Sequence, residues 1–414
     1  MKQSLHISLW SIRDMRLVLA GRTLCFAGDA VALVALMLRV SAEGGPGALS
    51  ALLLAFALPS VAAIPVAGRI VDRYDSRSVL VIASLVQAAA GAGTALVHGL
   101  VPTLAFVCVL QLGQAVAGPA WGALIPRIVG DDLVGRATGT GQALSGLAML
   151  AGSAAGGLLV GWFGGRTALL ADASTFAALA LVAMLVRTRR RPEPGRAPKG
   201  DGVLAGLDVV FADRLLRMIV PGLWAFVVAG EAINVVEVLL VTGDLRMSAP
   251  GYGLVLAVQG AGGIAGAWYA GRLSGDVTRT RAVLAGTTAI GAACLAMGSA
   301  QLVVQLVLGA VVCGLAAGLL NAATGALVVT RTPEQVRGRV LAGLNGSARA
   351  FSVGALVVGG AAGHWLGARG TYLLAGVGCL VVSALLVPAV GRARTAVPSG
   401  ARAGNDSARM VPTH

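Results

Sequence analysis

Two acidic residues stand near the middle of long apolar stretches, where an ionisable side chain is costly. Asp29 lies within residues 17–40, and Glu231 lies within residues 216–242. An unpaired charge at the centre of a bilayer costs roughly 2.5 kcal/mol or more, so both are candidates for function. Because desolvation disfavours the charged carboxylate, a proton and a cationic or polar substrate would compete for it. Such competition is the minimal requirement for exchanging a proton against a substrate.

Other polar residues share these apolar stretches. Asn234 is one turn from Glu231 and is expected to be the second polar group there, with Arg349 as a counter-ion for Glu231. Arg22 precedes Asp29 by seven residues on the same helical face, so it could instead neutralise Asp29 in a structural pair. Three further side chains could hydrogen-bond a substrate, although bonds between helices explain them equally well: Gln111, Gln114 and Asn321.

Acidic residues nearer the ends of the apolar stretches point to structural roles. Asp172 is expected to cap a helix or to pair with Arg166. Glu237 is expected to be water-exposed, because it lies closer to the outer end of its stretch. Both predictions place the chemistry at Asp29 and Glu231.

The sequence contains no constellation that predicts an enzyme, a metal site or a cofactor. No nucleophile, base and ligand set converges, and the phosphate-binding pattern G-x-x-x-x-G-K-(S/T) does not occur. The five cysteines lie inside apolar stretches without paired spacing. A membrane-embedded enzyme or sensor is therefore only a remote alternative. Because the sequence has no nucleotide-binding pattern, the energy for any transport must come from an ion or substrate gradient.

The elements that carry these residues are membrane spans. With 57% hydrophobic residues, 12% charged residues and a mean hydropathy of +0.83, the chain cannot be a water-soluble protein. A span needs about 20 apolar residues, which predicts an all-α integral membrane protein with twelve transmembrane helices. Their expected limits are 17–40, 48–68, 78–98, 102–125, 138–162, 168–186, 216–242, 251–272, 281–299, 302–330, 338–364 and 370–391.

The 32 Lys and Arg residues predict the orientation. Most fall on the loops that share a side with both chain ends, whereas the opposite loops hold Arg39, Arg166, Arg246 and Arg369. The positive-inside rule then puts both termini in the cytoplasm and the chain in the inner (plasma) membrane. The net charge of +14 is thus expected to face anionic lipid rather than nucleic acid.

The chain repeats itself at a fixed offset of 203 residues. Gly156, Trp162 and Arg166 recur as Gly359, Trp365 and Arg369, among other matches in the same register. A single offset indicates a duplicated six-helix unit, with both copies starting on the same side of the membrane. We expect a first half at 1–186, a cytoplasmic linker rich in Pro and Arg at 187–202, a second half at 203–391 and a disordered tail at 392–414.

A charged loop follows the second span. It fits the pattern G-x-x-x-D-(R/K)-x-x-x-(R/K)-(R/K) at Gly68, Asp72, Arg73 and Arg77, and it differs from the pattern only at Ser78. With the two parallel halves, this loop resembles the signature of the major facilitator superfamily and implies the major facilitator fold. Glycine there lets a helix end approach a neighbour, and the charged groups can pair in one global state and separate in another.

The resemblance implies how this loop would work. In the family the aspartate latches the cytoplasmic side while the carrier faces outward. Here the partners of Asp72 would be the start of the span at 338–364 and Arg136. A plain basic loop that only sets topology is the alternative.

Further segments resemble the macrolide-efflux and siderophore-exporter branch of drug:proton antiporters. They include Ala27 to Ala30, Pro119 to Pro126 and Gly156-Gly157. Two features differ: the fourth span lacks the usual arginine, and the antiporter pattern on the fifth span lacks its first glycine and its proline. The resemblance implies proton-coupled efflux of small hydrophobic or amphipathic compounds by a monomer. Export of a defined metabolite such as a siderophore, or lipid flipping, is the alternative.

Overall fold

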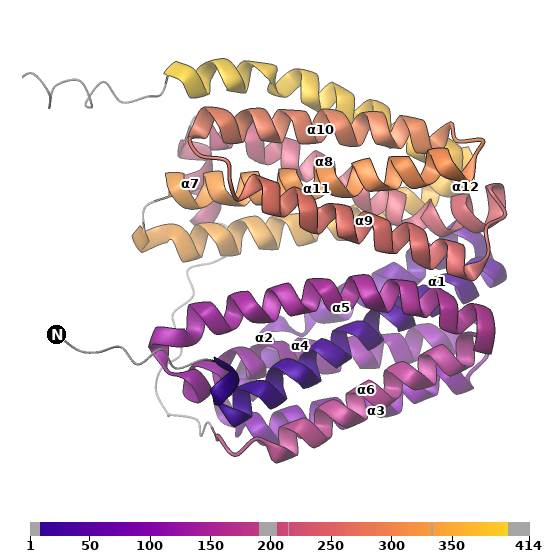
Figure 1. The fold of residues 1–414 in the computed structure, drawn as a ribbon, viewed down its shortest axis with the longest axis vertical. Helices are drawn as coiled ribbons and strands as arrows, with labels where there is room; N and C mark the ends of the chain where they lie inside the picture. The colour runs from indigo at the N-terminus through magenta and orange to yellow at the C-terminus, as the bar shows by residue number, and fades with distance from the viewer. Residues whose placement is uncertain (1–8, 190–204, 214, 333, 396–414) are drawn as a thin grey trace, which may run out of the picture.

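The computed structural model describes residues 9–189, 205–213, 215–332 and 334–395. All regular secondary structure in these ranges is helical (Figure 1). Most of the expected linker, from residue 190 onward, and the tail beyond residue 395 lie outside the described residues.

The N-terminal half contains six α-helices. They are α1 (Arg13–Ala62), α2 (Ile64–Arg73), α3 (Ser76–Leu96), α4 (Leu100–Val129), α5 (Val134–Phe163) and α6 (Gly165–Leu185). Two short 3-10 turns accompany them: η1 (Leu9–Ser11) precedes α1, and η2 (Asp131–Leu133) lies between α4 and α5.

The C-terminal half also contains six. They are α7 (Ala205–Ala212), α8 (Leu216–Val238), α9 (Ala249–Ala270), α10 (Asp276–Gly298), α11 (Val303–Arg331) and α12 (Glu334–Thr395), with a π-helical stretch, η3 (Leu239–Asp244), extending α8.

Two of the helices are each long enough for two spans. Ten helices of the described chain are apolar and long enough to cross a membrane. The 50 residues of α1 comprise two helices that meet at the non-helical Gly45 (φ 61°), and the 62 residues of α12 comprise two that meet at Gly367 (φ 70°). A helix rises about 1.5 Å per residue, so 50 residues exceed one bilayer thickness about twofold. Ten helices therefore supply the twelve predicted spans, and the all-α membrane fold is confirmed.

The two halves form separate bundles that lie one above the other in Figure 1. Their backbones repeat at the offset found in the sequence. The chain turns between α5 and α6 at Gly164 (φ 81°), and α12 bends at Gly367, which is 203 residues later. Glycine is required at both places because other residues rarely adopt a positive φ.

Contacts between the halves repeat in the same register. Gly157 of α5 packs against Gly253 of α9, and a Cβ added to Gly157 would lie 3.0 Å from the Cα of Gly253. Gly360 of α12 packs against Ser50 of α1, where a Cβ would lie 2.6 Å from the serine Cβ. The Ser50 hydroxyl also donates to the carbonyl oxygen of Leu356 at 2.6 Å. Both contacts obey the offset of 203, so a pseudo-twofold axis relates them.

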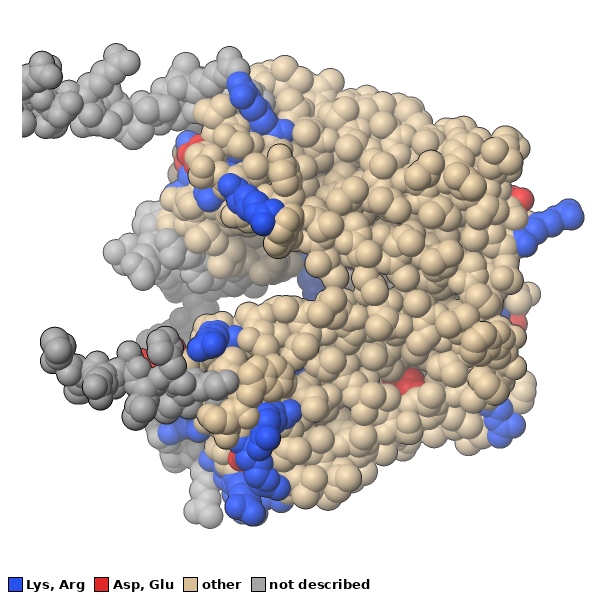
Figure 2. Space-filling view, in the orientation of Figure 1, with Lys and Arg blue, Asp and Glu red and all other residues tan. Residues whose placement is uncertain are grey.

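The molecule is closed at one end and open at the other. We call the end at which α1 begins the basic end, because Lys and Arg crowd it, and the opposite end the far end (Figure 2). The glycine contacts lie near the far end, towards the finish of α5. Figure 2 shows the molecule hollowed between the halves at the basic end.

Candidate functional site

Asp29 lies on the middle of the first span of α1 and is half-buried. It lines a small cavity of about 30 Å³ between α1, α4 and α6. Arg22 and Gln114 line the same cavity, as does Trp121, which is 3% exposed. The predicted neighbours Arg22 and Gln114 are therefore brought together with Asp29.

Arg22 does not form an ion pair with Asp29 in the part of the chain that the structure describes. Its guanidinium instead stacks over the ring of Phe26, 5.6 Å from the centroid. Such a cation–π contact stabilises the arginine without consuming a carboxylate. The structural pair considered as an alternative role for Asp29 is thus absent.

Asp172 of α6 is the second carboxylate of this site, and its predicted role was wrong. It is 2% exposed, its Oδ1 has no hydrogen-bond partner, and it interacts electrostatically with Asp29. A Cβ added to Gly28 would lie 2.7 Å from this Oδ1, so Asp172 packs directly on the backbone of α1. Arg166 is exposed and six residues away, which is 240° around the helix, so it cannot pair with Asp172.

Because Asp29 and Asp172 interact electrostatically, their carboxylates repel each other when both are charged. A proton on one of them, or a cation between them, removes the repulsion. The pair of Asp29 and Asp172 can therefore hold one positive charge and release it when another arrives. Within the described residues, no group of three or more His, Cys, Asp or Glu side chains could hold a metal ion.

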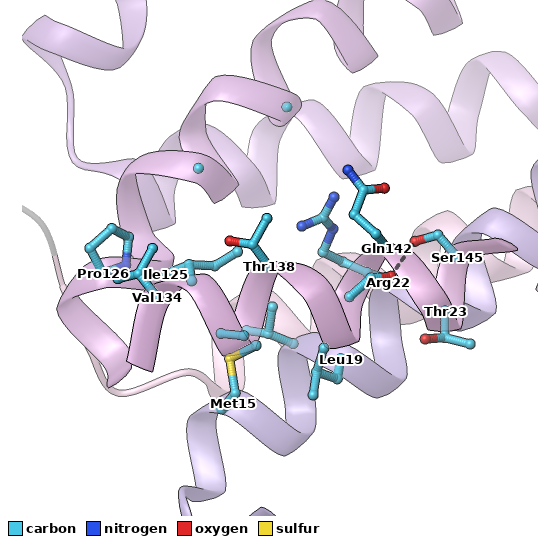
Figure 3. Close-up of a pocket in the computed structure, with 15 residues that line it drawn as sticks. Met15, Leu19, Arg22, Thr23, Ile125, Pro126, Val134, Thr138, Gln142 and Ser145 are labelled. Carbon is cyan, nitrogen blue, oxygen red and sulfur yellow. Dashed lines mark hydrogen bonds between the residues drawn. The ribbon is translucent and has the colours of Figure 1, made fainter. Parts of the chain in front are cut away.

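A larger cavity of about 210 Å³ lies between α1, α4 and α5 towards the basic end. Figure 3 shows Arg22 of α1 with Thr138 and Gln142 of α5 around this space. Arg22 and Gly118 line both this cavity and the small one that contains Asp29. The two cavities therefore adjoin, and Arg22 lies at their junction.

Glu231 of α8 is half-buried and hydrogen-bonded. The Ser352 hydroxyl donates to its Oε1 at 2.7 Å, and Asn234 donates to its Oε2 at 3.2 Å. Asn234 is thus beside Glu231, as expected. Arg349 is exposed and forms no ion pair with Glu231, so the predicted counter-ion is wrong. It lies three residues before Ser352, nearly one turn away, and Ser352 makes the contact instead.

The remaining polar candidates serve mostly as contacts between helices. Gln111 accepts from Ser60 at 3.3 Å, and Gln114 accepts from Gln87 of α3 at 3.1 Å. Asn321 of α11 is exposed and makes no side-chain hydrogen bond to the described residues. Gln114 is the one of the three that also faces Asp29.

Glu237 is buried in the C-terminal half, contrary to its predicted exposure. It is 2% exposed, and its Oε1 has no hydrogen-bond partner. Tyr252 of α9 and Tyr372 of α12, both buried, lie within electrostatic reach, and the Tyr372 hydroxyl also lacks a partner. Two residues after Glu237, α8 continues as the π-helical stretch η3. The apolar side chains on either side of Glu237 belong to the largest core cluster. This packing was invisible in the sequence.

The charged loop after the second span lies at the basic end. Asp72, Arg73 and Arg136 are exposed, and a Cβ on Gly68 would meet no atom within 4 Å. Arg77 donates to the carbonyl oxygen of Met184 and so ties this loop to the end of α6. Because a Cβ on Gly68 would meet no atom, the close approach predicted for this glycine is not formed among the described residues. Most side chains at the start of α12, the predicted partners of Asp72, lie outside the described residues.

The corresponding loop of the C-terminal half is held by ion pairs. Arg331 at the end of α11 contacts Asp276, the first residue of α10, at 2.8 Å. It also contacts Asp213, just after α7, at 3.0 Å. The second copy therefore stabilises its own half, whereas the first copy presents Asp72 to solvent.

A further carboxylate, Asp14, anchors the start of the first span at the basic end. Its Oδ2 accepts from the main-chain N–H groups of Arg187 and Thr188 and from the Thr188 hydroxyl, at 2.8–3.0 Å. Burial opposes ionisation, but the hydrogen bonds from Thr188 and Arg187 hold the pKa of the Asp14 carboxyl below its usual value. Asp14 thus fixes the end of the first half to its beginning.

These features define a multi-pass membrane transporter, built from two pseudo-symmetric six-helix halves that meet at one end and carry carboxylates within their spans. The family model of the Major Facilitator Superfamily matches residues 18–236 and again residues 220–410. The chain therefore belongs to this superfamily, and it is a transporter of small molecules rather than an enzyme.

Known proteins resemble it along its whole length. The multidrug efflux pump Tap of Mycobacterium tuberculosis is 29% identical over 397 residues, which cover 90% of this chain and 93% of Tap. An uncharacterized MFS-type transporter of Bacillus subtilis, YfiS, is 22% identical over 92% of this chain and 93% of its own.

Solved structures show the same fold at low sequence identity. The nucleoside transporter NupG is 13% identical, with a TM-score of 0.71 over 91% of this chain and 99% of NupG. A bacterial homologue of the iron transporter ferroportin, in an inward-facing state, is also 13% identical with a TM-score of 0.71, over 91% of this chain and 98% of that one.

Proposed function

We propose that this protein is a proton-coupled exporter of small hydrophobic or amphipathic compounds. The observation that carries the proposal is the pair of Asp29 and Asp172, which lies within the bilayer-spanning part of the first half without a cationic partner. The similarity to the multidrug efflux pump Tap supports this substrate class.

The proposed cycle is alternating access between the two halves. The structure is open at the basic end, and by the positive-inside rule this end faces the cytoplasm, with both chain termini on that side. The conformation is then inward-facing, like that of the ferroportin homologue. Rocking about the glycine contacts at the far end would open the other side. In this proposal the protein works as a monomer in the plasma membrane.

The carboxylate pair supplies the coupling. A cationic substrate that enters from the basic end passes the cavity around Arg22 and reaches Asp29. Its charge replaces the proton on the pair, and the proton leaves towards the cytoplasm. After rocking, the outer solution returns a proton and the substrate departs. Arg22 at the junction repels a bare cation, so only a substrate with enough apolar surface to offset this repulsion would pass.

The loop at Asp72 would act as the cytoplasmic latch. Asp72 is exposed here, where the basic end is open. In the outward-facing state it would pair with the start of α12, with Arg73, Arg77 and Arg136 providing the surrounding charge. An exposed Asp72 in an inward-open state is what this role requires.

The test measures substrate-dependent proton release from energised inverted vesicles, with ethidium as the substrate. Asp29→Asn and Asp172→Asn should each lower this release by about tenfold or more while the protein is still inserted. Asp132→Asn, which removes an exposed carboxylate near the basic end, is the matched control and should behave as the wild type. Unchanged release in both Asp29→Asn and Asp172→Asn would contradict the coupling role of the pair.

A further inference from the structure

Asp172 lines a further cavity, which lies at the side of the molecule. It has a volume of about 230 Å³ and lies between α1, α5 and α6, and we call it the lateral groove. Its walls are apolar except for the side chains of Asp172 and Thr175. Its lining includes Leu24, Ala151, Ala171, Asp172 and Thr175.

The lateral groove opens on the surface that faces lipid. Leu24 is 49% exposed and Ala151 is exposed, and both line the groove. Helices α5 and α6 of the first half face the viewer in Figure 1. In the same orientation, Figure 2 shows acidic atoms within the otherwise uncharged belt of this half. Asp172, which is 2% exposed, lies at the inner wall of this groove.

The groove contains an unsatisfied negative group. Oδ1 of Asp172 is buried and has no hydrogen-bond partner. The Thr175 hydroxyl donates at 2.8 Å to the main-chain oxygen of Asp172 and also lies near its carboxylate, of which Oδ1 has no hydrogen-bond partner among the described residues. A buried acceptor without a partner is unfavourable, and a bound cation would satisfy it.

We propose that the lateral groove is a binding site for lipid-soluble organic cations, which enter it from the bilayer and bind Asp172. The apolar walls fit the hydrophobic part of such a compound, and the carboxylate fits its charge. A neutral acyl chain would fill the walls but would leave the carboxylate unpaired. Because Asp172 interacts with Asp29, the groove delivers the cation to the carboxylate pair without passage through Arg22.

This inference rests on the proposed function for its role in transport, but binding can be measured separately. The probe is tetraphenylphosphonium, a lipid-soluble cation, bound at equilibrium to the full-length protein in nanodiscs. Tetraphenylborate, an anion of similar shape, is the matched probe and should not bind at the site.

The variants separate the groove from the rest of the lipid-facing surface. Ala171→Phe places a ring in the groove, and Asp172→Asn removes its charge; each should weaken tetraphenylphosphonium binding by about tenfold or more. Ala177→Phe, on the exposed surface of the same helix, is the control and should bind within about twofold of the wild type. If Ala171→Phe disturbs folding, Ala151→Trp at the exposed rim replaces it.

Equal binding by Ala171→Phe and Ala177→Phe, or equal binding of the two probes, would overturn the proposal. Failure of the proposed function looks different. If the wild type shows no ethidium-dependent proton release but the binding differences hold, the groove stands and the coupling is wrong. If Asp29→Asn abolishes release and Ala171→Phe leaves both release and binding unchanged, the coupling stands and the groove is wrong.

Discussion

Each half of this transporter buries a carboxylate of which one oxygen has no hydrogen-bond partner among the described residues, but the two carboxylates are enclosed differently. Asp172 of the first half lies between the Asp29 carboxylate and a groove open to lipid. Glu237 of the second half is enclosed by Tyr252, Tyr372 and apolar side chains. Burial alone therefore does not mark a transport residue. A path by which a proton or a substrate can reach the group is also needed.

A second comparison concerns the matching tripeptides Gly28-Asp29-Ala30 and Gly230-Glu231-Ala232. They are offset by 202 residues, whereas the other repeats are offset by 203. One residue turns a side chain by about 100° around a helix. Asp29 consequently faces α4 and α6, and Glu231 faces Ser352 of α12. The duplicated halves have kept their packing but have placed their carboxylates on different faces.

The largest effect is expected at the two glycines of these tripeptides. Gly28→Ala would place a Cβ 2.5 Å from Oγ1 of Thr175 and 2.7 Å from Oδ1 of Asp172. Overpacking of this kind costs about 1–3 kcal/mol, so the variant should melt earlier in detergent and lose ethidium efflux. Gly230→Ala meets no atom within 4 Å and should be neutral or slightly stabilising. Similar melting of both variants would remove the distinction between the two halves.

A smaller effect of opposite sign is expected at Glu237. Glu237→Met replaces an unpartnered acid by an apolar side chain of similar size and should stabilise the protein by about 1 kcal/mol. Ethidium efflux should stay within about twofold of the wild type. Glu231→Met is the control, which should destabilise because the Ser352 hydroxyl loses its acceptor. Loss of efflux in a stable Glu237→Met variant would show that the enclosed carboxylate takes part in transport.

The smallest effect is expected at Asp14, a carboxylate outside the spans with a full set of partners. Asp14→Asn should cost about 1 kcal/mol at neutral pH, because the hydrogen bonds to the charged group weaken. The lowered pKa in the folded state means that this contribution is present above the unfolded pKa and is lost as the pH falls through the folded one. The difference in melting temperature between wild type and variant should shrink below about pH 4. A difference that is independent of pH would exclude this role.

Much of the fold could be predicted from residue types alone. A bilayer forces every span to be helical and about 20 residues long, so hydropathy located the twelve spans. Repetition located the halves, because glycines such as Gly157 and Gly360 occupy equivalent contacts. The spans 17–40 and 48–68, and likewise 338–364 and 370–391, were predicted as separate helices, and in the structure the members of each pair meet at a single glycine, Gly45 and Gly367.

The candidate site was predicted only in part. Asp29 stood out because it interrupts a span, and Arg22 followed from helical spacing, whereas Gln114, on another span, was predicted only to bond a substrate or a neighbouring helix. Asp172 was assigned to a cap because its position along α6 suggested the membrane surface. One signal could have corrected this: Thr175 lies three residues after Asp172, so both face the same side of α6, and Gly28 is a small residue opposite.

By itself, the sequence determined the number of spans, the duplicated halves and the presence of rare acidic residues within the bilayer. These follow from composition and periodicity, which act along one helix at a time. Only the tertiary structure decided which acids meet, because a contact depends on the rotation of each helix and on how closely two backbones approach. It joined Asp29 to Asp172 across Gly28, enclosed Glu237 among tyrosines, and left Asp72 exposed at the open end.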